Sequence, residues 1–188
     1  IVLVTGVQTC ALPIFRPDEY VTCIFSEDLS YVLRTVITNK GPLGLTKANA
    51  PTPQAQAFEA MNAALGTGAN LWNGGQFYGT PEYNSLHLLR DYFTKYPDTA
   101  HSIVLGIKGG LDSNKIPNGT EAFIRQSVEE ALAILPPSLK KMDYFQCARV
   151  DPNVPIEDTL RALKTLVEEG KIGAIGLSEV KAETIRRA

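Results

Sequence analysis

Cysteine, histidine and tryptophan are scarce in this chain, and their scarcity excludes several kinds of site. The 188 residues include three cysteines, two histidines and one tryptophan. Three widely spaced cysteines supply neither a metal cluster nor a full disulfide framework, so we expect no metal site and a reducing, cytoplasmic setting. Cys147 ends an apolar run and has no histidine or lysine beside it, which favours a core thiol over a nucleophile.

An excess of charge of one sign is also absent, and so is a long apolar run. The formal net charge is -2 and the sequence pI is near 5.7, which gives no reason to expect nucleic acid or an anionic membrane as a partner. No apolar run reaches the ~18 residues that a membrane helix needs. With 44% hydrophobic residues, the composition predicts a globular domain, and we expect its partner to be a small molecule.

The first 40 residues do not show the pattern of the rest. Residues 4–14, VTGVQTCALPI, resemble the translation of a sequencing-library adapter. A signal peptide is the alternative, but no basic segment precedes the apolar residues. Residues 31–38 are β-branched in the manner of a strand and have no identifiable partner. We therefore expect residues 1–40 to be a non-native or unassigned segment outside the fold, and residues 41–188 to form the domain.

Within residues 41–188, short β-branched runs alternate with helical patterns. After an opening strand near Gly41, we expect strands at 71–72, 102–108, 142–150 and 172–177, and helices at 52–66, 81–96, 121–135, 155–170 and at the end of the chain. Such alternation predicts βαβ units with parallel strands. A doubly wound sheet would alternate in the same way, but its Gly-rich phosphate fingerprint follows none of these strands.

Two of the expected strands end in residues that can move a proton. Tyr78 follows the first of them in the turn WNGGQFYG, and Lys108 ends the run SIVLGIKGG. A phenol with an ordinary pKa near ~10 is a poor acid at neutral pH, and a nearby ammonium group makes it a better one. The alternatives are a tyrosine that packs on the next helix and a surface lysine. Thr80 is expected to cap that helix, with Pro81 as its first residue.

Four motifs occur in order along this region: WNGGQFYG, VLGIKGG, DYFQCARVDP and GKIGAIGLSEV. Together they resemble the aldo-keto reductases, most closely the pyridoxal reductase branch. The resemblance implies a (β/α)8 TIM barrel, of which about the first five βα units would lie in this chain, since ~250 residues are typical of the whole barrel. It further implies NADPH as cofactor and a small aldehyde, such as pyridoxal, as substrate.

The resemblance also assigns roles to residues of the first three motifs. Tyr78 matches the family's proton donor and Lys108 the cation that tunes it, while Asn73 stands where most members have an aspartate. Ala148 stands where most members have a histidine that orients the substrate. Arg149, the next residue, is a candidate for binding an anionic group of the substrate, with a structural ion pair as the alternative.

The fourth motif matches the segment that holds the nicotinamide carboxamide in the family. Ser178 fits this role by hydrogen bonding, and Glu179 stands where many members have asparagine. A helix N-cap at Ser178 is the alternative interpretation. The basic loops that bind the adenosine phosphate lie beyond Ala188 in the family, so the choice of NADPH over NADH rests on the resemblance alone.

Two further expectations follow from the missing strands. A sheet with open parallel edges would leave this chain alone unstable or prone to aggregate, and inactive by itself. The second function hypothesis is a non-catalytic or degenerate aldo-keto-reductase-like binding protein, which Asn73, Ala148 and the missing strands favour. Nothing in the sequence indicates the oligomeric state.

Overall fold

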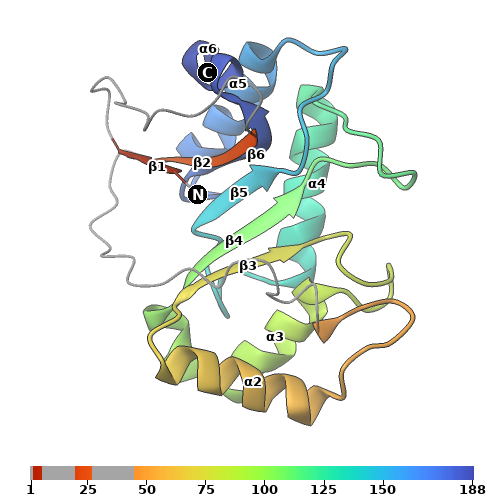
Figure 1. Ribbon diagram of the computed structural model, residues 1–188, viewed down its shortest axis with the longest axis vertical. Helices are drawn as coiled ribbons and strands as arrows, with labels where there is room; N and C mark the ends of the chain where they lie inside the picture. Colours follow the sequence, from red (N-terminus) through yellow and green to blue (C-terminus); the bar gives the residue numbers. More distant parts are fainter. Residues whose placement is uncertain (1, 6–19, 27–44) are drawn as a thin grey trace. The chain divides into compact units, whose positions relative to one another are not determined.

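The computed structural model describes residues 2–5, 20–26 and 45–188 (Figure 1). The strand-like residues 31–38 and the beginning of the expected domain, 41–44, lie outside the described residues. The described chain forms two compact units. We call residues 45–108 and 130–143 the Tyr78 unit. Residues 109–129 and 144–188, with the strands at 2–5 and 20–26, make up the Ser178 unit.

A parallel pair of strands forms the centre of the Tyr78 unit. β3 (Leu71–Gly75) pairs with β4 (Val104–Gly109), and α2 (Gln54–Gly66), α3 (Ser85–Lys95) and the 3-10 helix η1 (Pro97–Ser102) complete the unit. Figure 1 shows α2 and α3 on one side of the two strands. Aromatic rings join these layers: the ring centroids of Trp72 and Tyr92 lie 5.2 Å apart, and those of Phe58 and Tyr92 lie 5.5 Å apart. Edge-to-face contacts of this kind add to the burial of apolar area.

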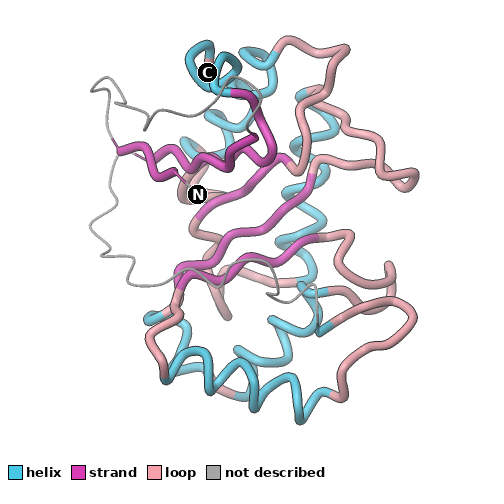
Figure 2. Tube along the Cα trace, in the orientation of Figure 1, coloured by secondary structure: helices cyan, strands magenta, loops and turns pink. Residues whose placement is uncertain are grey.

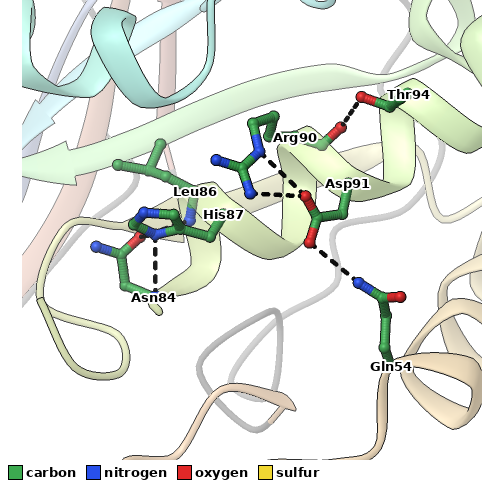
Figure 3. A network of polar contacts seen from close by, with 7 residues as sticks. All are labelled: Gln54, Asn84, Leu86, His87, Arg90, Asp91 and Thr94. Atoms are coloured by element: carbon green, nitrogen blue, oxygen red, sulfur yellow. Dashed lines mark hydrogen bonds and ion pairs between the residues drawn. The ribbon is translucent and has the colours of Figure 1, made fainter. Parts of the chain in front are cut away.

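The sequence placed the start of α3 four residues too early. The helix begins at Ser85, and Asn84 caps it by accepting a hydrogen bond from the Leu86 N–H at 2.9 Å, while His87 accepts one from the Asn84 N–H (Figure 3). The Thr80 hydroxyl instead accepts the N–H of Tyr83. The prediction of a cap at Thr80 is wrong because the chain first completes a turn, and a buried asparagine then satisfies the first N–H groups of the helix.

The Ser178 unit contains a second parallel pair. β5 (Tyr144–Cys147) pairs with β6 (Ile175–Lys181), and α4 (Glu121–Ile134) begins in this unit, which also holds α5 (Ile156–Glu168) and α6 (Ala182–Arg187). β6 begins and ends later than the 172–177 expected. Ser178 therefore lies inside a strand, and the alternative interpretation of it as a helix N-cap is wrong. The spacing of Asn118 and Glu121 in the sequence fits a capping box, with Asn118 as the N-cap, but α4 begins at Glu121 itself.

Two strands precede the domain expected from the sequence. β1 (Val2–Thr5) is parallel to β2 (Tyr20–Ser26), and β2 pairs with β6 in the antiparallel sense. Both come from the segment that we expected to lie outside the fold, and β2 covers one edge of β6. The domain boundary at residue 41 stays a prediction.

The alternation expected for residues 45–188 is present, as Figure 2 shows. The strands β3, β4, β5 and β6 are each followed by a helix, and the two pairs β3–β4 and β5–β6 are parallel. The α/β class is therefore confirmed. The opening strand near Gly41 has no counterpart in residues 45–53, and closure into a barrel stays a prediction.

Candidate functional site

Tyr78 follows the end of β3 in a tight turn. The Tyr78 N–H donates to the carbonyl oxygen of Gly75 at 3.2 Å, and the Gln76 N–H donates to the carbonyl oxygen of Lys108 at 3.0 Å. Gly75 is the register partner of Lys108 on the neighbouring strand. The turn therefore begins beside Lys108 and returns Tyr78 toward the same strand end.

The ring of Tyr78 lies against Gly75. A Cβ atom built on Gly75 would lie 3.1 Å from Cδ2 and 3.2 Å from Cε2 of that ring, closer than ordinary van der Waals contact. The ring can occupy this place only because Gly75 has no side chain. Since side chains alternate along a strand and register partners of parallel strands share a face, the ring lies on the face that carries Lys108.

Asn73 belongs to the same face. It lies two residues before Gly75, is half-buried in a strand of buried residues, and its amide nitrogen lies 3.5 Å from the Gly106 carbonyl oxygen. Lys108 is likewise the half-buried position of β4. On the opposite face, a Cβ atom on Gly74 would touch Ile107 and Leu89 at 3.0 Å. The structure thus brings together Asn73, Tyr78 and Lys108 on the face directed away from α3.

Sequence reasoning missed two residues that hold this turn. The Thr46 hydroxyl donates to the Tyr78 carbonyl oxygen at 2.6 Å, and the Ser85 N–H donates to the same oxygen at 2.9 Å. Both residues are buried. Because the sequence predicted a cap at Thr80 and a helix from Pro81, Ser85 was expected to lie in the helix interior. The pair Asn84–Ser85 is the signal that could have located the cap.

In the Ser178 unit, Arg149 forms an ion pair. Its Nη2 lies 2.9 Å from Oε1 of Glu179, and its Nη1 donates to the Ala148 carbonyl oxygen at 2.6 Å. Both charged side chains are about half exposed, 49% and 52%. This is the structural ion pair that the sequence analysis left as the alternative for Arg149. The neighbouring Ala148 is fully buried and has only a methyl group.

Ser178 is 1% exposed, and its buried hydroxyl has no hydrogen-bond partner among the residues that the structure describes. A buried hydroxyl without a partner is costly, and such groups in native folds call for an explanation. Glu179, the next residue, has φ +53°, in the left-handed region that favours glycine and asparagine. A hydroxyl can donate to and accept from a carboxamide, and a carboxylate can accept from its N–H groups. These two residues therefore fit the amide end of a nicotinamide.

Two further titratable residues, Cys147 and His87, have structural roles. Burial raises the pKa of the Cys147 thiol to about 12, which matches the expected core thiol. Burial also lowers the pKa of His87, which belongs to the cap of α3.

Among the described residues, no group of three or more His, Cys, Asp or Glu side chains could hold a metal ion. No helix in the part of the chain that the structure describes is long and apolar enough to cross a membrane.

A cavity of about 400 Å³ opens in the Ser178 unit but contains none of the predicted site residues. It is lined by residues 150–156 together with Thr184 and Arg187. Arg187 is already paired there with Glu157, at 2.8 Å. The size of this cavity is therefore no guide to the chemistry of Asn73, Tyr78 and Lys108, or to that of Ser178 and Glu179.

The sequence model of the Aldo/keto reductase family matches residues 40–188. "Probable pyridoxal reductase 2" of Schizosaccharomyces pombe is 50% identical over 150 residues, which are 79% of this chain and 45% of that protein. An oxidoreductase of the same yeast is 39% identical over 156 residues, 79% of this chain and 46% of that protein.

A Saccharomyces cerevisiae protein with a pyridoxal reductase name is 33% identical over 171 residues, 85% of this chain and 48% of that protein. The chain thus spans about half the length of the curated relatives that it matches. The family match covers most of the chain and all of the described residues except 2–5 and 20–26. The chain belongs to the aldo/keto reductase family.

Proposed function

We propose that this chain provides the proton-donating part of an NADPH-dependent reductase of small aldehydes, with pyridoxal as the first substrate to test. The observation that supports this most directly is the placement of Asn73, Tyr78 and Lys108 on one face at the C-terminal ends of β3 and β4. Active sites of (β/α)8 barrels lie at that end of the strands. In this proposal, the chain supplies about the first five βα units of such a barrel.

The chemistry follows from the three side chains. A bound nicotinamide would supply the hydride that reduces the carbonyl carbon. Tyr78 would donate its phenolic proton to the carbonyl oxygen, and the ammonium group of Lys108 would stabilise the phenolate that remains. Asn73 can accept a hydrogen bond from that ammonium group but offers no negative charge to hold it.

Ser178 and Glu179 would hold the cofactor at its amide end. The Ser178 hydroxyl is buried and lacks a partner in the described part of the chain, so a carboxamide could satisfy it at little cost. The choice of NADPH over NADH depends on groups that bind a phosphate, such as arginines or a helix N-terminus. It is proposed here from the family alone.

Arg149 is the proposed contact for an anionic group of the substrate, which requires the ion pair with Glu179 to open. Exposed pairs of this kind contribute about 0–1 kcal/mol, so opening costs little. The substrate's charge would then replace the Glu179 carboxylate as the partner of the guanidinium group.

The test is NADPH oxidation in the presence of pyridoxal, followed at the nicotinamide absorbance. It is run on this chain and on a chimera in which residues 40–188 replace the matched part of the S. pombe relative. We expect the chimera to oxidise NADPH and the Tyr78→Phe chimera to lose at least ~100-fold in kcat. A Tyr78→Phe chimera with the unchanged rate would reject Tyr78 as the proton donor.

A non-catalytic binding protein is the second candidate, and Ala148 is the observation that favours it. A buried methyl group where the family has a histidine can neither orient a carbonyl group nor move a proton. This candidate predicts that the chimera binds NADPH or pyridoxal, measured by calorimetry, with no turnover. Turnover that depends on Tyr78 would exclude it.

The first 40 residues are proposed to be a non-native segment. The family match begins at residue 40, which supports the boundary. Sequencing of the genomic locus across the codons of residues 1–40 tests this, because an adapter-derived segment would be missing there.

A further inference from the structure

We infer that Ser85 positions Tyr78, an inference that rests on the proposed function. Ser85 is fully buried and is the first residue of α3. Its contacts reach both ends of the four-residue turn that runs from Gly75 to Tyr78. No contact of Ser85 with a substrate is proposed.

The first set of contacts joins Ser85 to the end of β3. The Gly75 N–H donates to the Ser85 hydroxyl at 2.8 Å, and the same hydroxyl donates to the Gly75 carbonyl oxygen at 2.9 Å. A hydroxyl can donate and accept at once, so one side chain satisfies both main-chain groups of Gly75. The carbonyl oxygen of Gly75 also accepts from the Tyr78 N–H, so the hydroxyl and the turn share one acceptor.

The second contact joins Ser85 to Tyr78 itself. The Ser85 N–H donates to the Tyr78 carbonyl oxygen at 2.9 Å. Because the ring of Tyr78 lies on Gly75, a change in the distance between Gly75 and Tyr78 moves the ring relative to Lys108, the register partner of Gly75. Ser85 fixes both ends of that distance.

The cap at the start of α3 holds Ser85 in place, and with it the contacts of Ser85 with Gly75 and Tyr78. Asn84, which precedes Ser85, is buried and accepts the Leu86 N–H, and its own N–H is accepted by His87 (Figure 3). Ser85 therefore sits on a fixed helix terminus and not on a free loop. Rigid placement on a secondary-structure element is what a proton donor needs, since displacement by about 1 Å can cost ~100-fold in rate.

The test observes the Tyr78 ring directly, without requiring activity. The full chain is labelled with 3-fluorotyrosine, and the fluorine resonance of Tyr78 is assigned as the one missing from Tyr78→Phe. We expect Ser85→Ala to shift or broaden the Tyr78 resonance while the other tyrosine resonances stay in place. Ser85→Thr, which keeps the hydroxyl, should restore it.

Ser127→Ala is the matched control. Ser127 is also a buried serine whose hydroxyl accepts a glycine N–H, that of Gly110 at 3.0 Å. This variant should leave the Tyr78 resonance unchanged. If Ser85→Ala does not fold, Ser85→Cys replaces it, because a thiol fills similar space but is a weak donor and acceptor.

The same variants separate this inference from the proposed function. In the NADPH-oxidation assay, Ser85→Ala should lower kcat at least ~10-fold with KM within about twofold, because it affects placement of the acid and not substrate binding. A Tyr78 resonance that stays in place in folded Ser85→Ala or Ser85→Cys overturns the inference. Absence of turnover in the unmutated chimera rejects the proposed function instead, and the resonance still decides the role of Ser85.

Discussion

Arg149, two residues past the end of β5, forms an ion pair with Glu179 in β6, and Glu179 has a left-handed backbone conformation. Nη2 of Arg149 lies 2.9 Å from Oε1 of Glu179, whose φ is +53°. Ser178, whose hydroxyl is buried, directly precedes Glu179 in the chain. Strained backbone of this kind is often kept at functional sites, where it serves the geometry of a ligand and not stability.

The strain at Glu179 can be relieved by asparagine. A left-handed conformation costs most side chains roughly 1–2 kcal/mol, and asparagine adopts it more readily. Glu179→Asn should therefore raise the free energy of unfolding by about 0.5–1 kcal/mol in high salt, where the exposed ion pair is screened. Urea unfolding at low and high salt measures this, with Arg149→Gln as the control that removes the pair alone. A loss of stability in both salts would show that the backbone is not strained.

The place of the Tyr78 ring predicts a marked difference between two glycine substitutions. Gly75→Ala puts a methyl group 3.1 Å from Cδ2 of Tyr78, so it should destabilise the fold by about 1–3 kcal/mol and displace the ring. Gly66→Ala, at the end of α2, meets nothing within 4 Å and should stabilise by up to about 1 kcal/mol. Thermal unfolding of both variants measures the difference. If the two substitutions changed the stability equally, the Tyr78 ring would not lie against Gly75.

Sequence patterns were informative where local spacing decides the structure. On the apolar face expected for the helix at 121–135, Ile124, Val128, Ala131 and Leu135 are buried and Leu132 is half-buried, because helical periodicity alone determines that face. The placement of Tyr78 and Lys108 at the ends of neighbouring strands followed in the same way, from two short runs and the glycines after them.

The features that sequence missed depend on contacts between distant residues. The cap at Asn84 and the contacts of Ser85 with Gly75 and Tyr78 arise because residues 79–84 turn back on themselves. Such a turn leaves no periodic pattern in the sequence. The extension of β6 through Ser178 depends on pairing with other strands, and it determines whether that hydroxyl is buried. The partner of Arg149 is 30 residues away along the chain, so the sequence could offer it only as one of two alternatives.

The buried thiol of Cys147 is expected to be inert in the folded chain. Burial raises its pKa to about 12, and the thiolate is the reactive form. At pH 8, alkylation of Cys147 should be at least ~100-fold slower in the native chain than in urea. Peptide mapping by mass spectrometry follows this cysteine separately from the other two. Rapid labelling in native buffer would show that the end of β5 opens readily.

Glu169 lies between two cations, Arg125 and Lys171. A bidentate contact with Arg125, at 2.7 and 2.8 Å, and a further contact with Lys171 lower the pKa of its carboxyl group to about 2. Because the folded-state pKa lies below the unfolded value of ~4.3, this group stabilises the fold fully above that value. The contribution is lost as the pH falls from the unfolded pKa through the folded one.

Glu169→Gln should therefore lower Tm at pH 7, and the difference from the unmutated chain should shrink between pH 4.5 and pH 2. Salt should reduce the effect, because the carboxylate and its partners are partly exposed. Glu168→Gln is the matched control: its carboxylate is more exposed and lies 3.8 Å from Lys164, so its Tm should depend on pH as that of the unmutated chain does. Calorimetric scans at pH 7, 4.5, 3 and 2 measure all three proteins. If the Tm difference of Glu169→Gln persisted unchanged at pH 2, the stabilisation would come from packing of the side chain, and the charge on Glu169 would play no part in it.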